Sequence, residues 1–128
     1  MKIVLAICVC LMIGCGEKSA KPKSYIPNEK DLALSRQMAE SLEENAEAGN
    51  KIAQFQFGGM YFFGEYPKTK DFVAAYAWTY ISASNGWSIA EANKSTIAGS
   101  MTPDQIAEAM ALVEEMIKKN PELIQKKE

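Results

Sequence analysis

The sequence predicts an all-α fold, a short solenoid built from antiparallel helix hairpins. Small and apolar residues recur three or four positions apart in segments of helical length. Glycine, asparagine and proline residues separate these segments and supply helix start and stop signals. In addition, AEAGNKIA at residues 46–53 matches ASNGWSIA at residues 83–90 in four of eight positions, 37 residues further on. A repeat period of this length is typical of helical solenoids.

Start and stop signals divide residues 29–120 into five expected helices. Asn28 can cap the first helix, and Asp31 suits its first turn. Asp71 can cap the third helix, while Thr102 and Gln105 form a capping-box pattern at the start of the last. The expected helices are about Glu29–Ala48, Lys51–Gly64, 72–85, Ser88–Ala98 and 103–119.

The expected first and third helices differ in how much of their surface is apolar. In the first helix one stripe predicts a single packed face, formed by Leu34, Met38, Ser41, Leu42, Asn45 and Ala46. The glutamates of this helix fall elsewhere and predict a solvated acidic face. The third helix is apolar nearly all round, so we expect it to lie between neighbouring helices.

The first residues have the layout of a secretory signal. Lys2 precedes an apolar run from Ile3 to Ile13, which is shorter than the about 20 residues that a membrane-spanning helix needs. The run ends in MIGC, which resembles the lipobox of bacterial lipoproteins. This resemblance implies that residues 1–14 are a signal peptide and that Cys15 is lipidated. The alternative interpretation is a buried N-terminal helix.

Residues 15–28 are expected to form a flexible linker between the lipid anchor and the domain. The segment contains two prolines and few apolar residues, so it cannot bury enough surface to order itself. All three cysteines lie in the first fifteen residues, so a mature chain that begins at Cys15 has no internal disulfide. We expect a cell-envelope protein, anchored in the outer membrane and facing the periplasm if the source is Gram-negative.

Composition argues against several classes of function. A length of 128 residues suits one domain, and a formal charge of −2 gives no basic surface for nucleic acid. The sequence contains no histidine, the most frequent general base and a common zinc ligand. We therefore expect no catalytic residues, no cofactor and no metal site.

The central stretch combines small, aromatic and turn-forming residues in one spacing pattern, namely Ala53, Phe57, Gly58, Tyr61, Gly64, Asp71, Ala75, Trp78, Ala83 and Gly86. In these residues the stretch resembles the Sel1-like repeat, a relative of the tetratricopeptide repeat. The resemblance covers most of Asn45 to Met116 and implies a right-handed α-α hairpin solenoid, with about one full repeat and a capping helix at each end. Tyr66 departs from the family pattern, because the family favours glycine there.

The aromatic residues left over after the core is filled are candidates for binding a partner. At about 100° per residue, the packed side of the second helix holds Phe57 and Tyr61, and the opposite side holds Gln56 and Phe63. We expect Phe63 to be a surface anchor within an aromatic patch. The candidate protein-binding residues are Gln56, Phe62, Phe63, Tyr66 and Trp87. The alternative is that the terminal helices cover these rings.

The favoured function is a lipid-anchored envelope adaptor that binds another envelope protein or a peptide and has no catalytic activity. Sel1-like proteins generally act as scaffolds for protein complexes, which is what the resemblance implies here. The alternative is an envelope hydrolase that acts on cell-wall or β-lactam material. A homodimer formed through the aromatic patch is a third hypothesis. Residues 121–128 are expected to be a frayed tail.

Overall fold

The computed structural model describes residues 26–126. The predicted signal peptide, Cys15 and residues 15–25 of the predicted linker lie outside the described residues. No helix of the described part combines the length and the apolar character needed to cross a membrane.

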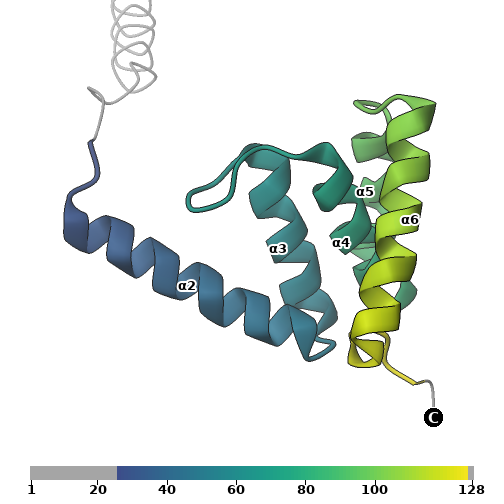
Figure 1. The fold of residues 1–128 in the computed structure, drawn as a ribbon, viewed down its shortest axis with the longest axis horizontal. Coiled ribbons are helices and arrows are strands. Elements are labelled where there is room, and N and C mark those ends of the chain that lie inside the picture. Colours follow the sequence, from purple (N-terminus) through teal and green to yellow (C-terminus); the bar gives the residue numbers. More distant parts are fainter. Residues whose placement is uncertain (1–25, 127–128) are drawn as a thin grey trace, which may run out of the picture.

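Five α-helices and one short 3₁₀ helix make up the described chain, which is all-helical as predicted (Figure 1). The five predicted helices are confirmed, with boundaries that differ by at most one residue. The elements are α2 Glu29–Glu47, α3 Lys51–Phe63, α4 Phe72–Ser84, α5 Ser88–Ala98, α6 Pro103–Lys119 and η1 Pro121–Leu123.

The predicted caps hold the ends of these helices. The Asn28 side chain accepts from the Asp31 N–H at 3.0 Å, and Thr102 accepts from the Gln105 N–H at 3.2 Å, each within a complete capping box. Asp71 accepts from the Ala74 N–H and caps α4. Each cap satisfies a backbone donor that the first turn of a helix leaves free. The ends of these helices are therefore set by local sequence.

Helices α3 and α4 form the central hairpin and approach each other closely. A Cβ added at Gly58 would lie 3.1 Å from the Trp78 Cβ and 3.2 Å from the Ala75 carbonyl oxygen, so only glycine fits without displacing α4. The Phe57 ring packs edge-on against Trp78, with ring centroids 5.1 Å apart. This alternation of small and aromatic residues confirms the predicted packing of the hairpin.

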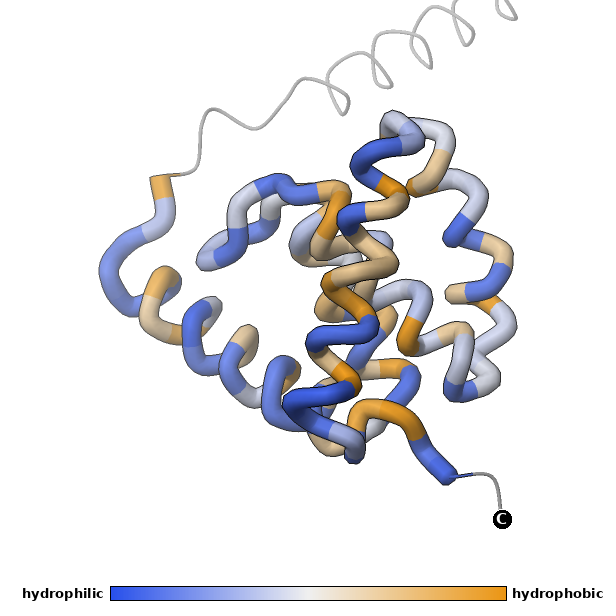
Figure 2. Tube along the Cα trace, turned by 45° about the vertical axis from the view of Figure 1, so that its right-hand side comes forward, coloured by the Kyte–Doolittle hydropathy of each residue, from blue (hydrophilic) through white to orange (hydrophobic). Residues whose placement is uncertain are grey.

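The remaining helices pack on the two sides of the central hairpin. Helix α2 packs against α3, while α5 and α6 pack against α4, which leaves α4 between neighbours as predicted. Figure 1 shows α2 meeting α3 at the turn between them and diverging from it toward its N-terminus. Orange apolar positions recur among blue polar ones along α2 and α6 (Figure 2).

The predicted packed face of α2 is wrong for most of its residues. Ala46 is buried and Leu42 half-buried, but Ser41 and Asn45 are exposed, and Leu34 and Met38 are 56% and 65% exposed. The packed face is rotated by about one residue, or about 100°, from the predicted stripe, because Ala39, the residue after Met38, is the buried one. Two apolar side chains that the period places on the packed face are therefore left on the surface.

The prediction of a frayed tail is wrong for residues 121–126. Leu123 is 2% exposed and belongs to the hydrophobic core. Its carbonyl oxygen accepts from Gln54 Nε2 at 2.9 Å and from Asn85 Nδ2 at 2.7 Å. Asn120 Nδ2 donates to the Glu47 carbonyl oxygen at 3.0 Å. The tail thus ties the C-terminal ends of α2 and α4 together.

Candidate protein-binding groove

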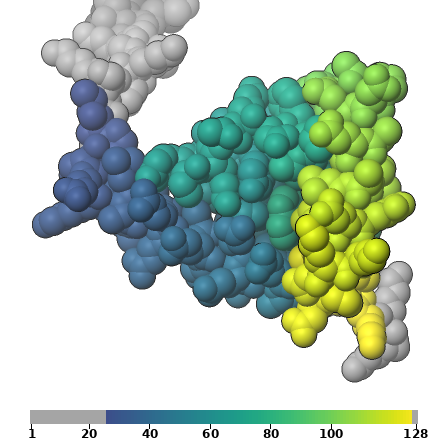
Figure 3. Space-filling view, viewed as in Figure 1, coloured from purple at the N-terminus to yellow at the C-terminus, as the bar shows by residue number. Residues whose placement is uncertain are grey.

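A groove of about 550 Å³ lies between the diverging helices α2 and α3. The space-filling view shows it as a hollow between the blue α2 and the teal segments beside it (Figure 3). One wall comes from α2, the other from α3, and the loop after α3 closes one end. The residues that line it are Ser35, Met38, Ala39, Leu42, Gln56, Gly59, Met60, Phe63, Glu65 and Tyr66.

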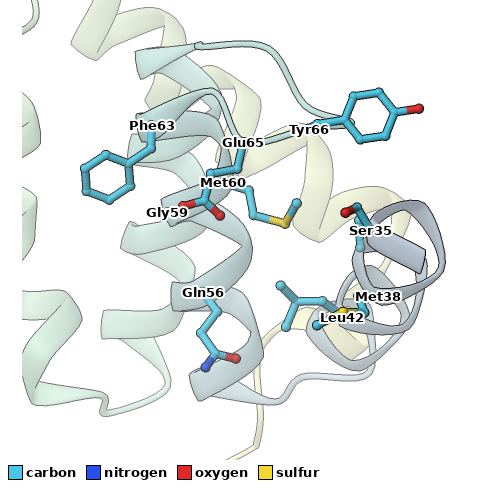
Figure 4. Close-up of a pocket in the computed structure, with 10 residues that line it drawn as sticks. Ser35, Met38, Leu42, Gln56, Gly59, Met60, Phe63, Glu65 and Tyr66 are labelled. Carbon is cyan, nitrogen blue, oxygen red and sulfur yellow. The ribbon is translucent and has the colours of Figure 1, made fainter. Parts of the chain in front are cut away.

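The walls of the groove are mostly apolar. Met38 and Leu42 project from α2 toward α3, and Met60 projects from α3 toward α2 (Figure 4). Gly59 lies on the α3 wall, where an added Cβ would meet nothing within 4 Å. The wall is therefore flat at this point and leaves room for a side chain from outside.

The loop between α3 and α4 is fastened to α2 by two polar contacts. Arg36 Nη2 donates to the Tyr66 hydroxyl at 2.9 Å, and Lys68 Nζ lies 3.2 Å from Glu43 Oε2. Tyr66, the departure from the family pattern, therefore has a contact of its own in this chain. The two contacts hold the loop across one end of the groove.

Lys68 also lies over aromatic rings of the core. Its Nζ is 4.9 Å from the centroid of Phe57 and 5.5 Å from that of Tyr61, within cation–π range. Burial acts to lower the pKa of Lys68, but the hydrogen bond to Glu43 and the charges of Tyr61 and Glu43 outweigh it, so the pKa is raised. Lys68 is held in its charged form between α2 and the core.

Three of the five candidate binding residues line the groove. Phe63 is 69% exposed, and its ring points away from α2 at the end of α3 (Figure 4). Gln56 lies on the same wall, and Tyr66 lies at the loop end. The predicted exposure of Phe63 is confirmed. The alternative that a terminal helix covers its ring is wrong for the described chain.

Of the other two candidates, Phe62 adjoins Phe63 and Trp87 lies apart, so the five residues do not form a single patch. The Phe62 ring packs edge-on against Phe63, with ring centroids 5.0 Å apart, and on Phe72 at 5.5 Å, and it is half-buried. Trp87 lies at the turn after α4, whereas Phe63 lies near the start of α4, and the 13 residues between those ends span about 20 Å. The indole N–H of Trp87 is buried and has no hydrogen-bond partner in the described chain.

The residues predicted to build the repeat occupy structural positions. The backbone of Gly64 and Gly86 is left-handed, with φ of 69° and 85°, which favours glycine. The residues that are buried in or beside the central hairpin are Ala53, Phe57, Gly58, Ala75 and Trp78, and Tyr61 and Ala83 are half-buried. Asp71 is the cap of α4.

Sequence reasoning missed the α2 wall of the groove. The sequence places Met38 and Leu42 on a packed face, but only Leu42 packs against the core, and the period of the helix cannot show that Met38 lies uncovered in residues 26–126. The chemistry of the site is that of binding, because apolar walls with few polar atoms suit an apolar surface. Among the described residues, no group of three histidine, cysteine or acidic side chains could hold a metal ion.

The comparisons with known proteins bear on the fold. No model of a known protein family matches the chain, and no curated protein matches it. A crystal structure of a protective antigen present in uropathogenic Escherichia coli strains, described as displaying an SLR fold, is similar to it, with a TM-score of 0.62 and 28% sequence identity. The match covers 70% of this chain and 19% of the solved chain, so this protein spans about a fifth of that one. The described chain therefore has an all-helical repeat fold, and the likeness supports a Sel1-like repeat within it.

Proposed function

We propose that this protein is a lipid-anchored adaptor of the cell envelope that binds another protein or peptide in the groove between α2 and α3, without catalysis. The observation that supports the proposal is the exposure of Met38 and Phe63, 65% and 69%, beside an apolar groove of about 550 Å³. Covering one such side chain stabilises a complex by about 1.5 to 3 kcal/mol. A few of them at one site are enough to anchor a partner.

The test is site-specific photocrosslinking in the cells that make the protein, with benzoylphenylalanine at position 38 of the full chain. We expect a reproducible envelope protein to be crosslinked, and its yield to fall in a chain that also carries Phe63→Ala. The matched control is Ile89→Ala, because Ile89 is also an exposed apolar residue but lies at the start of α5. Loss of the crosslink in both variants, or in neither, would contradict binding in this groove.

The lipid anchor is tested separately. Cys15→Ser should move the protein from the membrane fraction to the soluble fraction, because stable anchoring depends on the acyl chains. Continued membrane retention of the variant, without incorporation of labelled fatty acid, would contradict the anchor. Turnover of a chromogenic β-lactam by the purified protein would instead favour the hydrolase alternative.

A further inference from the structure

The internal repeat seen in the sequence is also a repeat in space. In the turn between α2 and α3, the Gly49 N–H donates to the Ala46 carbonyl at 3.1 Å; in the turn between α4 and α5, the Gly86 N–H donates to the Ala83 carbonyl at 2.9 Å. The Asn50 to Asn45 bond of the first turn likewise corresponds to the Trp87 to Ser82 bond of the second.

Each of these pairs differs by 37 residues, and Gly49 and Gly86 share a left-handed backbone, with φ of 90° and 85°. The helix pairs α2–α3 and α4–α5 are therefore two copies of one unit.

The same groove exists in both units, but in the second it is filled. Four residues that line the open groove are Leu42, Gln56, Gly59 and Met60. Their counterparts 37 residues later are Thr79, Asn93, Thr96 and Ile97, and all four line a cavity between α3, α4 and α5. That cavity measures only about 90 Å³, against about 550 Å³ for the groove in the first unit.

Helix α3 is the element that fills the second groove. The α3 residues that share its lining are Phe55, Gly58, Gly59 and Phe62, together with Phe63. The first four fall at positions i, i+3, i+4 and i+7, which is one face of a helix. Gly58 brings the helix close to α4, and the phenylalanines on either side of the two glycines fill the ends of the groove.

Helix α3 covers one face of α4. The corresponding face of α2 is left open in the described chain. Ala75 is fully buried against Gly58, whereas its counterpart Met38 is 65% exposed. Thr79 is also buried, whereas its counterpart Leu42 is half-buried and lines the open groove. Within residues 26–126, the first unit therefore lacks the covering helix that the second unit has.

The chain itself does not carry a suitable helix at the corresponding place. The residues 37 positions before Phe55, Gly58, Gly59 and Phe62 are Lys18, Lys21, Pro22 and Tyr25. Three of these four cannot supply the small and aromatic side chains of the α3 face, and proline inside a helix removes a hydrogen bond and costs about 3 kcal/mol. The sequence that leads to Ile26 thus does not repeat the α3 face, which favours an occupant from another protein.

We propose that the partner of the adaptor is an amphipathic α-helix of another protein. This helix packs on α2 and α3 in the way that α3 packs on α4 and α5. It carries large apolar residues at positions i and i+7 and small residues at i+3 and i+4. It also carries a basic residue at the end near Glu65, the charged side chain of the groove lining. This inference rests on the proposed function and adds the class of partner to it.

The test is fluorescence anisotropy with the full lipidated chain in phospholipid nanodiscs. The probe is a stapled, fluorescein-labelled peptide that copies Lys51–Phe63, with Phe57, Tyr61 and Phe63 replaced by lysine so that the α3 face remains the apolar one. The control peptide also carries serine in place of Phe55 and Phe62. We expect the probe to bind and the control peptide to bind about tenfold more weakly or worse, since two aromatic contacts are lost.

Variants of the protein place the binding in the groove. Gly59→Leu fills the open wall, where an added Cβ meets nothing within 4 Å, and Met38→Arg puts a charge on the α2 wall. Both should weaken probe binding about tenfold or more. Ile89→Arg is the matched control, because Ile89 is exposed at the second turn, and it should bind the probe as the unchanged protein does.

The outcomes separate this inference from the proposed function. A partner crosslinked from position 38 in cells, together with no binding of the probe, would leave the adaptor function standing and overturn the helical occupant. If Gly59→Leu and Met38→Arg leave probe binding unchanged, the probe binds outside the groove. This result would also overturn the inference. A crosslink from position 38 only to a second copy of this chain would overturn the inference as well. Absence of both a cellular partner and probe binding would overturn both proposals.

Discussion

Asn85 Nδ2 donates a hydrogen bond of 2.8 Å to Gln54 Oε1 and so joins the start of α3 to the end of α4. Gln54 is fully buried, and its amide group donates to the carbonyl oxygens of Ala46 and Leu123 at 3.0 and 2.9 Å. All the polar atoms of the Gln54 side chain therefore have partners. Buried polar groups of this kind stabilise a fold only while every bond is made.

Gln54→Leu should lower the free energy of unfolding by about 2 kcal/mol. The substitution keeps the volume but removes the three hydrogen bonds of the buried amide group, to Ala46, Leu123 and Asn85, and each such bond contributes about 0.5 to 1.5 kcal/mol. Urea denaturation measures the change. Gln56→Leu is the matched control, because Gln56 is exposed half a turn away on the same helix, and it should change the free energy by less than about 0.5 kcal/mol.

Leu123→Ala should destabilise the protein by about 2 to 4 kcal/mol, because Leu123 is buried in the core and its removal leaves a cavity. Thermal denaturation followed by circular dichroism tests this. Leu34→Ala makes the same chemical change at a side chain that is 56% exposed, and it should have little effect. Equal melting temperatures for the two variants would show that the tail contributes nothing.

Gly58→Ala and Gly59→Ala should change stability in opposite directions, although the two residues are neighbours in α3. At Gly58 the added Cβ would approach the Trp78 Cβ to 3.1 Å, and overpacking of this kind costs about 1 to 3 kcal/mol. At Gly59 the Cβ enters open space, so the better helix propensity of alanine should stabilise the protein by about 0.5 to 1 kcal/mol. Chemical denaturation measures the free energy of unfolding of both variants. A loss of stability in Gly59→Ala would contradict an open groove wall.

Trp78→Ala should cost about 3 to 5 kcal/mol, since the substitution empties the centre of the hairpin where Trp78 packs on Phe57. This is a large share of the stability of a small domain. Phe63→Ala removes a ring that is 69% exposed and should leave the melting temperature nearly unchanged. A melt that Trp78→Ala does not alter would refute the packing of the central hairpin.

Lys68→Met should lower the free energy of unfolding by roughly 1 kcal/mol at neutral pH, because it removes a partly buried ion pair and a cation–π contact. The pKa of Lys68 is raised in the folded protein above its ordinary value of 10.5, so folding favours the charged form. The stabilisation of the folded protein by charged Lys68 is therefore fully present below pH 10.5 and is lost as the pH rises through the raised pKa. The difference in unfolding free energy between the unchanged protein and Lys68→Met should stay constant from neutral pH to about pH 10 and shrink as the pH rises above 10.5, as urea titrations at each pH would show. A difference that grows with pH would contradict the assignment.

The parts of the fold that the sequence predicted are those that depend on residues close together in the chain. Asn28 caps a helix through Asp31, three residues away, and Thr102 does so through Gln105. The exposure of Phe63 also followed from helix geometry once the packed side of α3 was identified. These features need no knowledge of how the helices sit in space.

The features that the sequence could not predict depend on distant partners or on missing ones. Gln54 bonds to Leu123 across 69 residues, and no local pattern signals that contact. Met38 has the right period for a packed face, but the helix that would cover it is not in the described chain. Trp87 joined the expected patch only because aromatic residues were grouped without regard to the length of α4.

The bonds made by the tail also set the order of events during synthesis. Gly49 sits where an added Cβ would come within 2.6 Å of the Glu122 carbonyl oxygen, so the first turn of the domain is closed by residues at the C-terminal end of the described chain. A ribosome must release residues 120–125 before Gln54 and Asn85 can complete their bonds. A nascent chain paused anywhere before Leu123 therefore still lacks this closure.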